Sequence, residues 1–72
     1  MGLRWTPERF DQLENAARQG RRVVLVRRGT EYVVIALRIV TVGGREALVG
    51  RLPMTGSEME FVLDDIESFQ VL

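Results

Sequence analysis

Five arginines between residues 18 and 28 form the densest group of side chains that could bind a ligand. Guanidinium groups bind phosphate oxygens through paired hydrogen bonds, so this arginine cluster could contact a nucleic acid. Strand alternation would place the side chains on both sides of a strand, and no aromatic residue stands among them to stack on bases. An arginine-rich solvated surface is the alternative explanation. The arginine cluster comprises Arg18, Arg21, Arg22, Arg27 and Arg28.

Three acidic residues near the amino end are spaced by three positions. Glu8, Asp11 and Glu14 would share one side of a helix, because residues three apart are neighbours on a helix surface. They could form a negative ridge that docks on a basic protein surface. The alternative is the ordinary polar face of an amphipathic helix.

A third group of charges lies near the carboxyl end. A hard cation needs several oxygens that converge on one point, and nothing in the spacing of these carboxylates requires convergence. Charges on alternate positions of a strand more often protect a sheet edge from aggregation. We therefore predict no metal site. The group comprises Glu58, Glu60, Asp64, Asp65 and Glu67.

The composition argues against catalysis. The chain has no cysteine, and its ten basic residues are all arginine, with no histidine or lysine. Thiolate, imidazole and Schiff-base chemistry are therefore excluded, and we predict neither an enzyme nor a cofactor. Ten acids balance the ten arginines, but residues 16–45 hold seven arginines and one acid, whereas residues 46–72 hold six acids and one arginine. Such a dipolar chain can present opposite charges to different partners or to a copy of itself.

Local signals predict one helix followed by five strands. Thr6 can cap a helix whose first residue is Pro7, and Gly20 can end it, so we expect a helix over about residues 7–19. Trp5 and Phe10 occupy the positions of a hydrophobic staple. The expected strands are 23–26, 30–42, 46–52, 59–63 and 68–72, with a glycine hairpin turn at 43–44 and a helical turn at 64–66.

The fold expected from this order is mostly β with one amino-terminal α-helix. We predict a single domain over residues 1–72, with a small five-stranded SH3-like or Sm-like antiparallel barrel over about residues 21–72. The alternative is a flat antiparallel sheet with the helix packed across one face. Residues 32–35 are apolar on both faces of their strand. We expect the helix and barrel closure to bury them, and burial in an oligomer or against a partner is the alternative.

Nothing in the sequence indicates a membrane protein. The longest apolar run has six residues, and the amino terminus carries no secretory signal, so we expect a cytoplasmic protein. The first six residues fit a loose myristoylation pattern that chance explains better.

Two blocks of the chain resemble the bacterial Rof (YaeO) family, whose members inhibit the transcription terminator Rho. Residues 10–16, Phe-Asp-Gln-Leu-Glu-Asn-Ala, are similar to the family helix with its aromatic-Asp-x-Leu-Glu-x-Ala pattern. Residues 56–69 resemble the family's glycine turn followed by Glu-apolar-x-Leu-Asp-x-Ile-x-Ser-Phe. The blocks are separated as in the family, and the resemblance extends over most of the chain. It implies an Sm-like barrel that binds a protein and catalyses nothing.

The resemblance also implies a site. In the family an acidic surface that includes the helix docks on Rho and keeps RNA from its primary site. The matching acids here are Asp11, Glu14 and Asp64, with Glu8 nearby.

Three hypotheses follow. The first is a Rof-like regulator that docks Glu8, Asp11 and Glu14 on Rho. The second is an Sm-like module that binds RNA through the arginine cluster. The third is an oligomerising domain of unassigned role.

Overall fold

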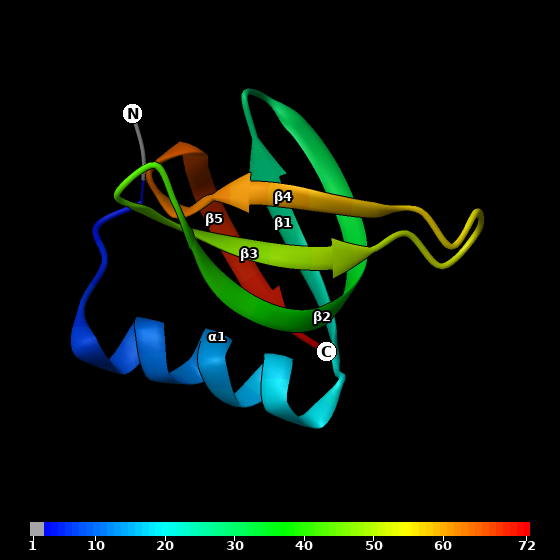
Figure 1. The fold of residues 1–72 in the computed structure, drawn as a ribbon, viewed down its shortest axis with the longest axis horizontal. Coiled ribbons are helices and arrows are strands. Elements are labelled where there is room, and N and C mark those ends of the chain that lie inside the picture. Colours follow the sequence, from blue (N-terminus) through cyan, green and yellow to red (C-terminus); the bar gives the residue numbers. More distant parts are fainter. Residues whose placement is uncertain (1–2) are drawn as a thin grey trace.

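The computed structural model describes residues 3–72, which form one helix, five strands and a single 3₁₀ turn (Figure 1). The elements are α1 (Pro7–Gln19), β1 (Arg22–Arg27), β2 (Thr30–Val42), β3 (Arg45–Arg51), β4 (Glu58–Val62), η1 (Leu63–Asp65) and β5 (Ile66–Val71). The predicted helix and the mostly β content are confirmed. Residues 1–2, which include the acceptor glycine of the myristoylation pattern, lie outside the described residues. No helix of the described chain is long and apolar enough to cross a membrane.

The two ends of α1 are capped by the residues that the sequence indicates, Thr6 and Gly20. The Thr6 side chain accepts a hydrogen bond of 3.2 Å from the backbone N–H of Arg9. At the other end Gly20 adopts a φ of 64°, where a residue with a Cβ would be strained. The helix buries a short apolar stripe made of Leu13, Ala16 and Ala17.

The five strands form one antiparallel sheet in the order β4-β3-β2-β1-β5. The 13-residue β2 is its longest member, and its register against β3 shifts between Ala36 and Arg38. A register shift of this kind is typical of a β-bulge, in which one extra residue bends the strand and increases its twist. The sheet consequently curls, and α1 lies beneath it against β2 and β5 (Figure 1). The alternative, an antiparallel sheet with the helix packed across one face, is therefore correct in these two respects, and only its flatness is wrong.

The core lies inside the curl. Paired positions such as Val23 and Val34 face inward and are fully buried. Gly50 belongs to the same face, where a Cβ would come within 2.7 Å of a Val34 methyl, so a glycine allows β3 to approach β2. The largest fully buried side chains are Leu13, Val23, Leu25, Val34, Leu48, Phe61 and Ile66.

The sheet is not closed into a barrel, contrary to the prediction. No ladder joins β4 and β5 in the described chain, so these two strands remain the edges of the sheet. The amino-terminal segment contacts the edge of β5 at its first residue. There the backbone N–H of Leu3 donates a 2.7 Å hydrogen bond to the carbonyl oxygen of Ile66. The last strand begins at Ile66, earlier than the predicted start at residue 68. The turn before it, η1, begins at residue 63, whereas the predicted turn begins at residue 64.

The apolar residues 32–35 are divided between the two faces of the sheet. Tyr32 and Val34 face the core, whereas Val33 and Ile35 lie on the outer face. Val33 is 41% exposed. The helix and the curl of the sheet therefore bury only one of the two faces, and no barrel closure contributes in the described chain.

Candidate protein-binding surface

The three acids of α1 are all exposed, as expected for the outer side of an amphipathic helix. Glu14 accepts a 3.2 Å hydrogen bond from the Arg18 guanidinium four residues later, in a pair that remains exposed to water. Glu8 and Asp11 form no ion pair within residues 3–72. Two of the three predicted carboxylates therefore have no basic side chain bonded to them within the described residues.

A hollow of about 260 Å³ lies beside the first turns of α1. Its apolar part is made by Trp5, Phe10 and Leu63, which come from the amino-terminal segment, α1 and η1. The β2–β3 hairpin and η1 supply its remaining lining residues. These are Gly44, Arg45, Glu46 and Asp64.

The Trp5 side chain is held in place from two directions. Its indole Nε1 donates a 2.8 Å hydrogen bond to the carbonyl oxygen of Leu63. Its ring stacks on Phe69, with ring centroids 5.4 Å apart and planes inclined by 10°. Trp5 and Phe10 thus share one hollow, but the aromatic partner of the indole is Phe69 of β5. A fixed aromatic side chain can bind a partner without losing much conformational entropy.

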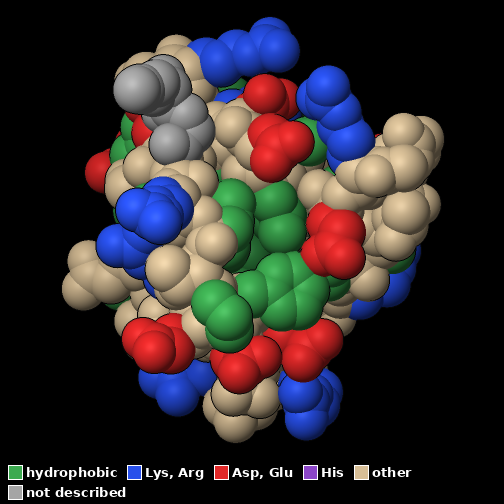
Figure 2. Space-filling view, turned by 90° about the vertical axis from the view of Figure 1, so that its left-hand side faces the viewer, with side chains coloured by type: hydrophobic (Ala, Val, Ile, Leu, Met, Phe, Trp, Pro, Cys, Tyr) green, Lys and Arg blue, Asp and Glu red, His purple; other side chains and the backbone are tan. Residues whose placement is uncertain are grey.

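Two of the three charged side chains that line this hollow are acidic. Figure 2 shows hydrophobic side chains gathered at the centre of the face, with acidic side chains above, beside and below them. Glu46 and Asp64 belong to the lining, and Asp11 follows Phe10 in α1. The opposing charge in the lining is Arg45. The surface is therefore an apolar centre with a mainly acidic rim, and it suits an apolar side chain flanked by cations.

Glu14 does not belong to this rim. It lines a separate groove of about 380 Å³ with residues of α1 and of the bend in β2, among them Arg18 and Arg38. Those two arginines make this groove less acidic than the hollow. The predicted ridge of three helix acids is thus divided, because Glu8 and Asp11 do not line this groove.

The arginine cluster does not form one surface. Arg21 donates two hydrogen bonds, of 3.1 and 2.6 Å, to the backbone oxygen of Leu72. Arg28 lies 3.9 Å from the Asp65 carboxylate, and Arg18 bonds to Glu14. Arg22 lies on the outer face of the sheet, opposite Ile35. The five guanidinium groups therefore point to different parts of the molecule.

Arg27 has a structural role that the sequence analysis missed. Its guanidinium carbon lies 4.9 Å from the Phe61 ring centroid and 5.2 Å from that of Tyr32. The same group donates hydrogen bonds to the Tyr32 hydroxyl at 3.3 Å and to the Glu60 backbone oxygen at 3.5 Å. This arginine closes the core beside two aromatic rings, which makes it poorly available to phosphate.

The carboxylates near the carboxyl end are also dispersed. Glu58 accepts a 3.3 Å hydrogen bond from Arg38, and Asp65 faces Arg28. Within residues 3–72, no group of three or more His, Cys, Asp or Glu side chains is placed to hold a metal ion.

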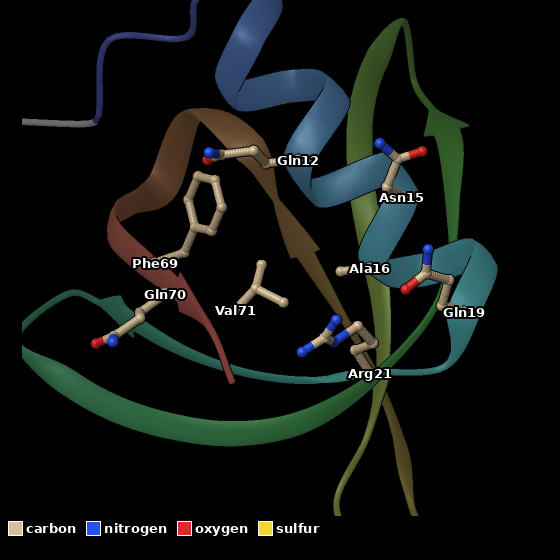
Figure 3. A pocket seen from close by; sticks show the side chains of 8 residues that line it. All are labelled: Gln12, Asn15, Ala16, Gln19, Arg21, Phe69, Gln70 and Val71. Carbon is tan, nitrogen blue, oxygen red and sulfur yellow. The ribbon is translucent and has the colours of Figure 1, made fainter.

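A further groove, of about 480 Å³, lies between α1 and β5 (Figure 3). Phe69, Val71 and Ala16 form its apolar part, and the Phe69 ring points from β5 toward Gln12 of the helix. Its polar lining consists of Gln12, Asn15, Gln19, Arg21 and Gln70. Amides donate and accept hydrogen bonds but are poor acids and bases, so this lining is suited to binding.

The composition of the hollow was only partly accessible to sequence reasoning. Asp11 and Asp64 were identified from the family resemblance, and Trp5 and Phe10 were identified as a helix staple. Glu46 was not singled out, and no local signal connects it with η1. Comparison with protein-family models and with curated proteins finds no match to this sequence.

Proposed function

We propose that this protein is a non-catalytic binding protein that docks the acid-rimmed hollow on a basic surface of another protein. The observation that best supports this is the hollow itself, where Trp5 and Phe10 form an apolar centre and Glu46 and Asp64 lie in the lining. Aromatic centres contribute most of the affinity in protein interfaces. Charges around them determine which sign of charge the partner's surface must carry, and they raise the rate of association.

The resemblance to the Rof family supplies the identity of the partner. We propose that it is Rho, that docking keeps RNA from the primary site of Rho, and that the protein acts in the cytoplasm. Two acids implied by the resemblance support this, because Asp64 lines the hollow and Asp11 follows the Phe10 that lines it. The fold proposed with it is an open form of the Sm-like barrel. The bent β2, the turn before β5 and the preceding helix support that fold.

RNA binding by the arginine cluster remains the alternative. The dispersed guanidinium groups do not favour it, because Arg27 is held against aromatic rings and Arg21 against the end of the chain. Both functions can be tested in one experiment.

The experiment is a calorimetric titration of purified Rho, and in parallel of a short single-stranded RNA, with this protein at low and at high salt. The variant Glu46→Arg/Asp64→Arg reverses the two acids that line the hollow. The control Glu60→Arg/Glu67→Arg reverses two exposed acids that do not line it. We expect the control to bind Rho like the wild type. The hollow variant should bind at least about tenfold more weakly, and affinity should fall with salt.

Two results would contradict the proposal. The first is no binding to Rho at low salt, and the second is equal affinity for the hollow variant and its control. Salt-dependent RNA binding that is lost in Arg22→Glu/Arg28→Glu would support the alternative.

A further inference from the structure

An apolar patch lies on the outer face of the sheet, away from the helix and the hollow. Val24 and Val33 are directly opposite each other on β1 and β2, and both alternate with residues that face the core, among them the fully buried Val23, Leu25 and Val34. The same alternation places the neighbours at i±2 on the outer face. The patch, called here the outer valine patch, comprises Val24, Val26, Val33 and Ile35.

The two ends of this patch carry opposite charges. At one end Arg22 and Arg51 are both paired with Ile35, one on each side of it. At the other end Glu31 is paired with Val26. Arg22, Arg51 and Glu31 are exposed and form no ion pair within the described chain. An apolar strip with a basic end and an acidic end can complement an inverted copy of itself.

We propose that the outer valine patch is a homodimer interface with its two-fold axis at right angles to the strands. A two-fold axis parallel to the strands would place the arginine end on the arginine end, and like charges there would oppose association. A perpendicular axis reverses the strand direction of the second copy. Glu31 of one copy then faces Ile35 of the other, between the guanidinium groups of Arg22 and Arg51. The charge pattern thus selects one of the two symmetric arrangements.

The other charges near the patch do not change this choice. Arg28, next to the acidic end, faces Asp65, and Glu58, opposite Arg51 on β4, bonds to Arg38. Each of these side chains already has an opposite charge as its neighbour.

The size of the patch indicates a weak dimer. A stable interface buries roughly 800 Å² per partner, about one sixth of the 4710 Å² surface of this chain. The patch has four apolar side chains, of which Val33, at 41%, is the most exposed. These side chains provide less surface than a stable interface buries. We therefore expect association between micromolar and millimolar concentrations, weakened by salt. The inference is independent of the proposed function, because the hollow is formed by other residues.

The test is sedimentation velocity of the full chain over this concentration range at low salt. Arg22→Glu and Glu31→Arg each place like charges across the interface and should weaken self-association at least about tenfold. Arg45→Glu and Glu46→Arg make the same charge changes at the β2–β3 hairpin and should leave it unchanged.

A mixing experiment separates interface effects from unfolding. Arg22→Glu/Arg51→Glu protein mixed with Glu31→Arg protein restores both attractive contacts, so the mixture should form a heterodimer although each variant alone is monomeric. The triple variant Arg22→Glu/Glu31→Arg/Arg51→Glu should dimerise like the wild type. A wild type that stays monomeric at millimolar concentration would overturn the proposal. So would variants that still self-associate, or a mixture that remains monomeric.

Discussion

The indole Nε1 of Trp5 donates a 2.8 Å hydrogen bond to the carbonyl oxygen of Leu63, which is 58 residues further along the chain. This contact joins the segment before α1 to the turn before β5. Both residues line the hollow, so the hydrogen bond fixes the position of its apolar floor. The ring and the N–H of Trp5 have different partners, so a substitution can remove the hydrogen bond and keep an aromatic ring.

Trp5→Phe should lower the free energy of unfolding by about 1 kcal/mol, because a partly buried carbonyl loses its donor. The new ring can still stack on Phe69. Urea unfolding measures the change, and Met54→Ala, at a side chain that is 95% exposed, is the control. Unchanged stability would mean that water replaces the indole N–H without cost.

Gly50→Ala should destabilise the protein by about 1–3 kcal/mol, because the added methyl meets Val34 Cγ2 at 2.7 Å and Cβ at 2.9 Å in a packed core. Val34→Ala removes both Cγ methyl groups. The double variant should therefore be less destabilised than the sum of the two single variants, as a double-mutant cycle in urea would show. Strict additivity would mean that β3 moves away instead of pressing on Val34.

Arg27→Met should lower the free energy of unfolding by about 1 kcal/mol, because the guanidinium loses its contacts with the rings of Tyr32 and Phe61. Any affinity for RNA should stay the same. Arg28→Met is the matched control, since the Arg28 side chain is 82% exposed and should cost little. A drop in RNA affinity specific to the Arg27 variant would assign that residue to phosphate contact instead.

Calcium or magnesium at millimolar concentration should leave the melting temperature unchanged. Glu58 is bonded to Arg38 at 3.3 Å, and Asp65 lies 3.9 Å from Arg28, so each carboxylate already faces a guanidinium. Ion binding to the native state would raise the melting temperature with saturation. Such a rise, absent with an equal ionic strength of sodium chloride, would contradict the prediction.

Much of the secondary structure could be predicted from local signals. Thr6, Pro7 and Gly20 define α1, because capping and backbone preference act within a few residues. Gly43 and Gly44 form the turn between β2 and β3, both with positive φ. The closed barrel was wrong because closure depends on how two edge strands meet. Here Leu3 and η1, which carry no sequence signal for that role, lie at the edge of β5.

The candidate site depended on packing to a greater degree. Asp11 and Glu14 have the same spacing signal in the sequence, yet Glu14 lines a groove and bonds to Arg18, while Asp11 forms no ion pair within the described residues. Arg27 looked like a member of a basic cluster, but its strand position turns it toward Tyr32 and Phe61.

The sequence by itself determined which residues form the helix and strands and which alternate positions of each strand are apolar, because these depend on interactions between near neighbours. It also determined the absence of thiol and imidazole chemistry. The tertiary structure decided that Trp5, Phe10, Glu46 and Asp64 meet in one hollow and that Val33 stays on the outer face. Those outcomes depend on the curl of β2 and on contacts between opposite ends of the chain, such as that of Trp5 with Phe69. For such contacts the packing of the whole sheet selects among many locally acceptable arrangements.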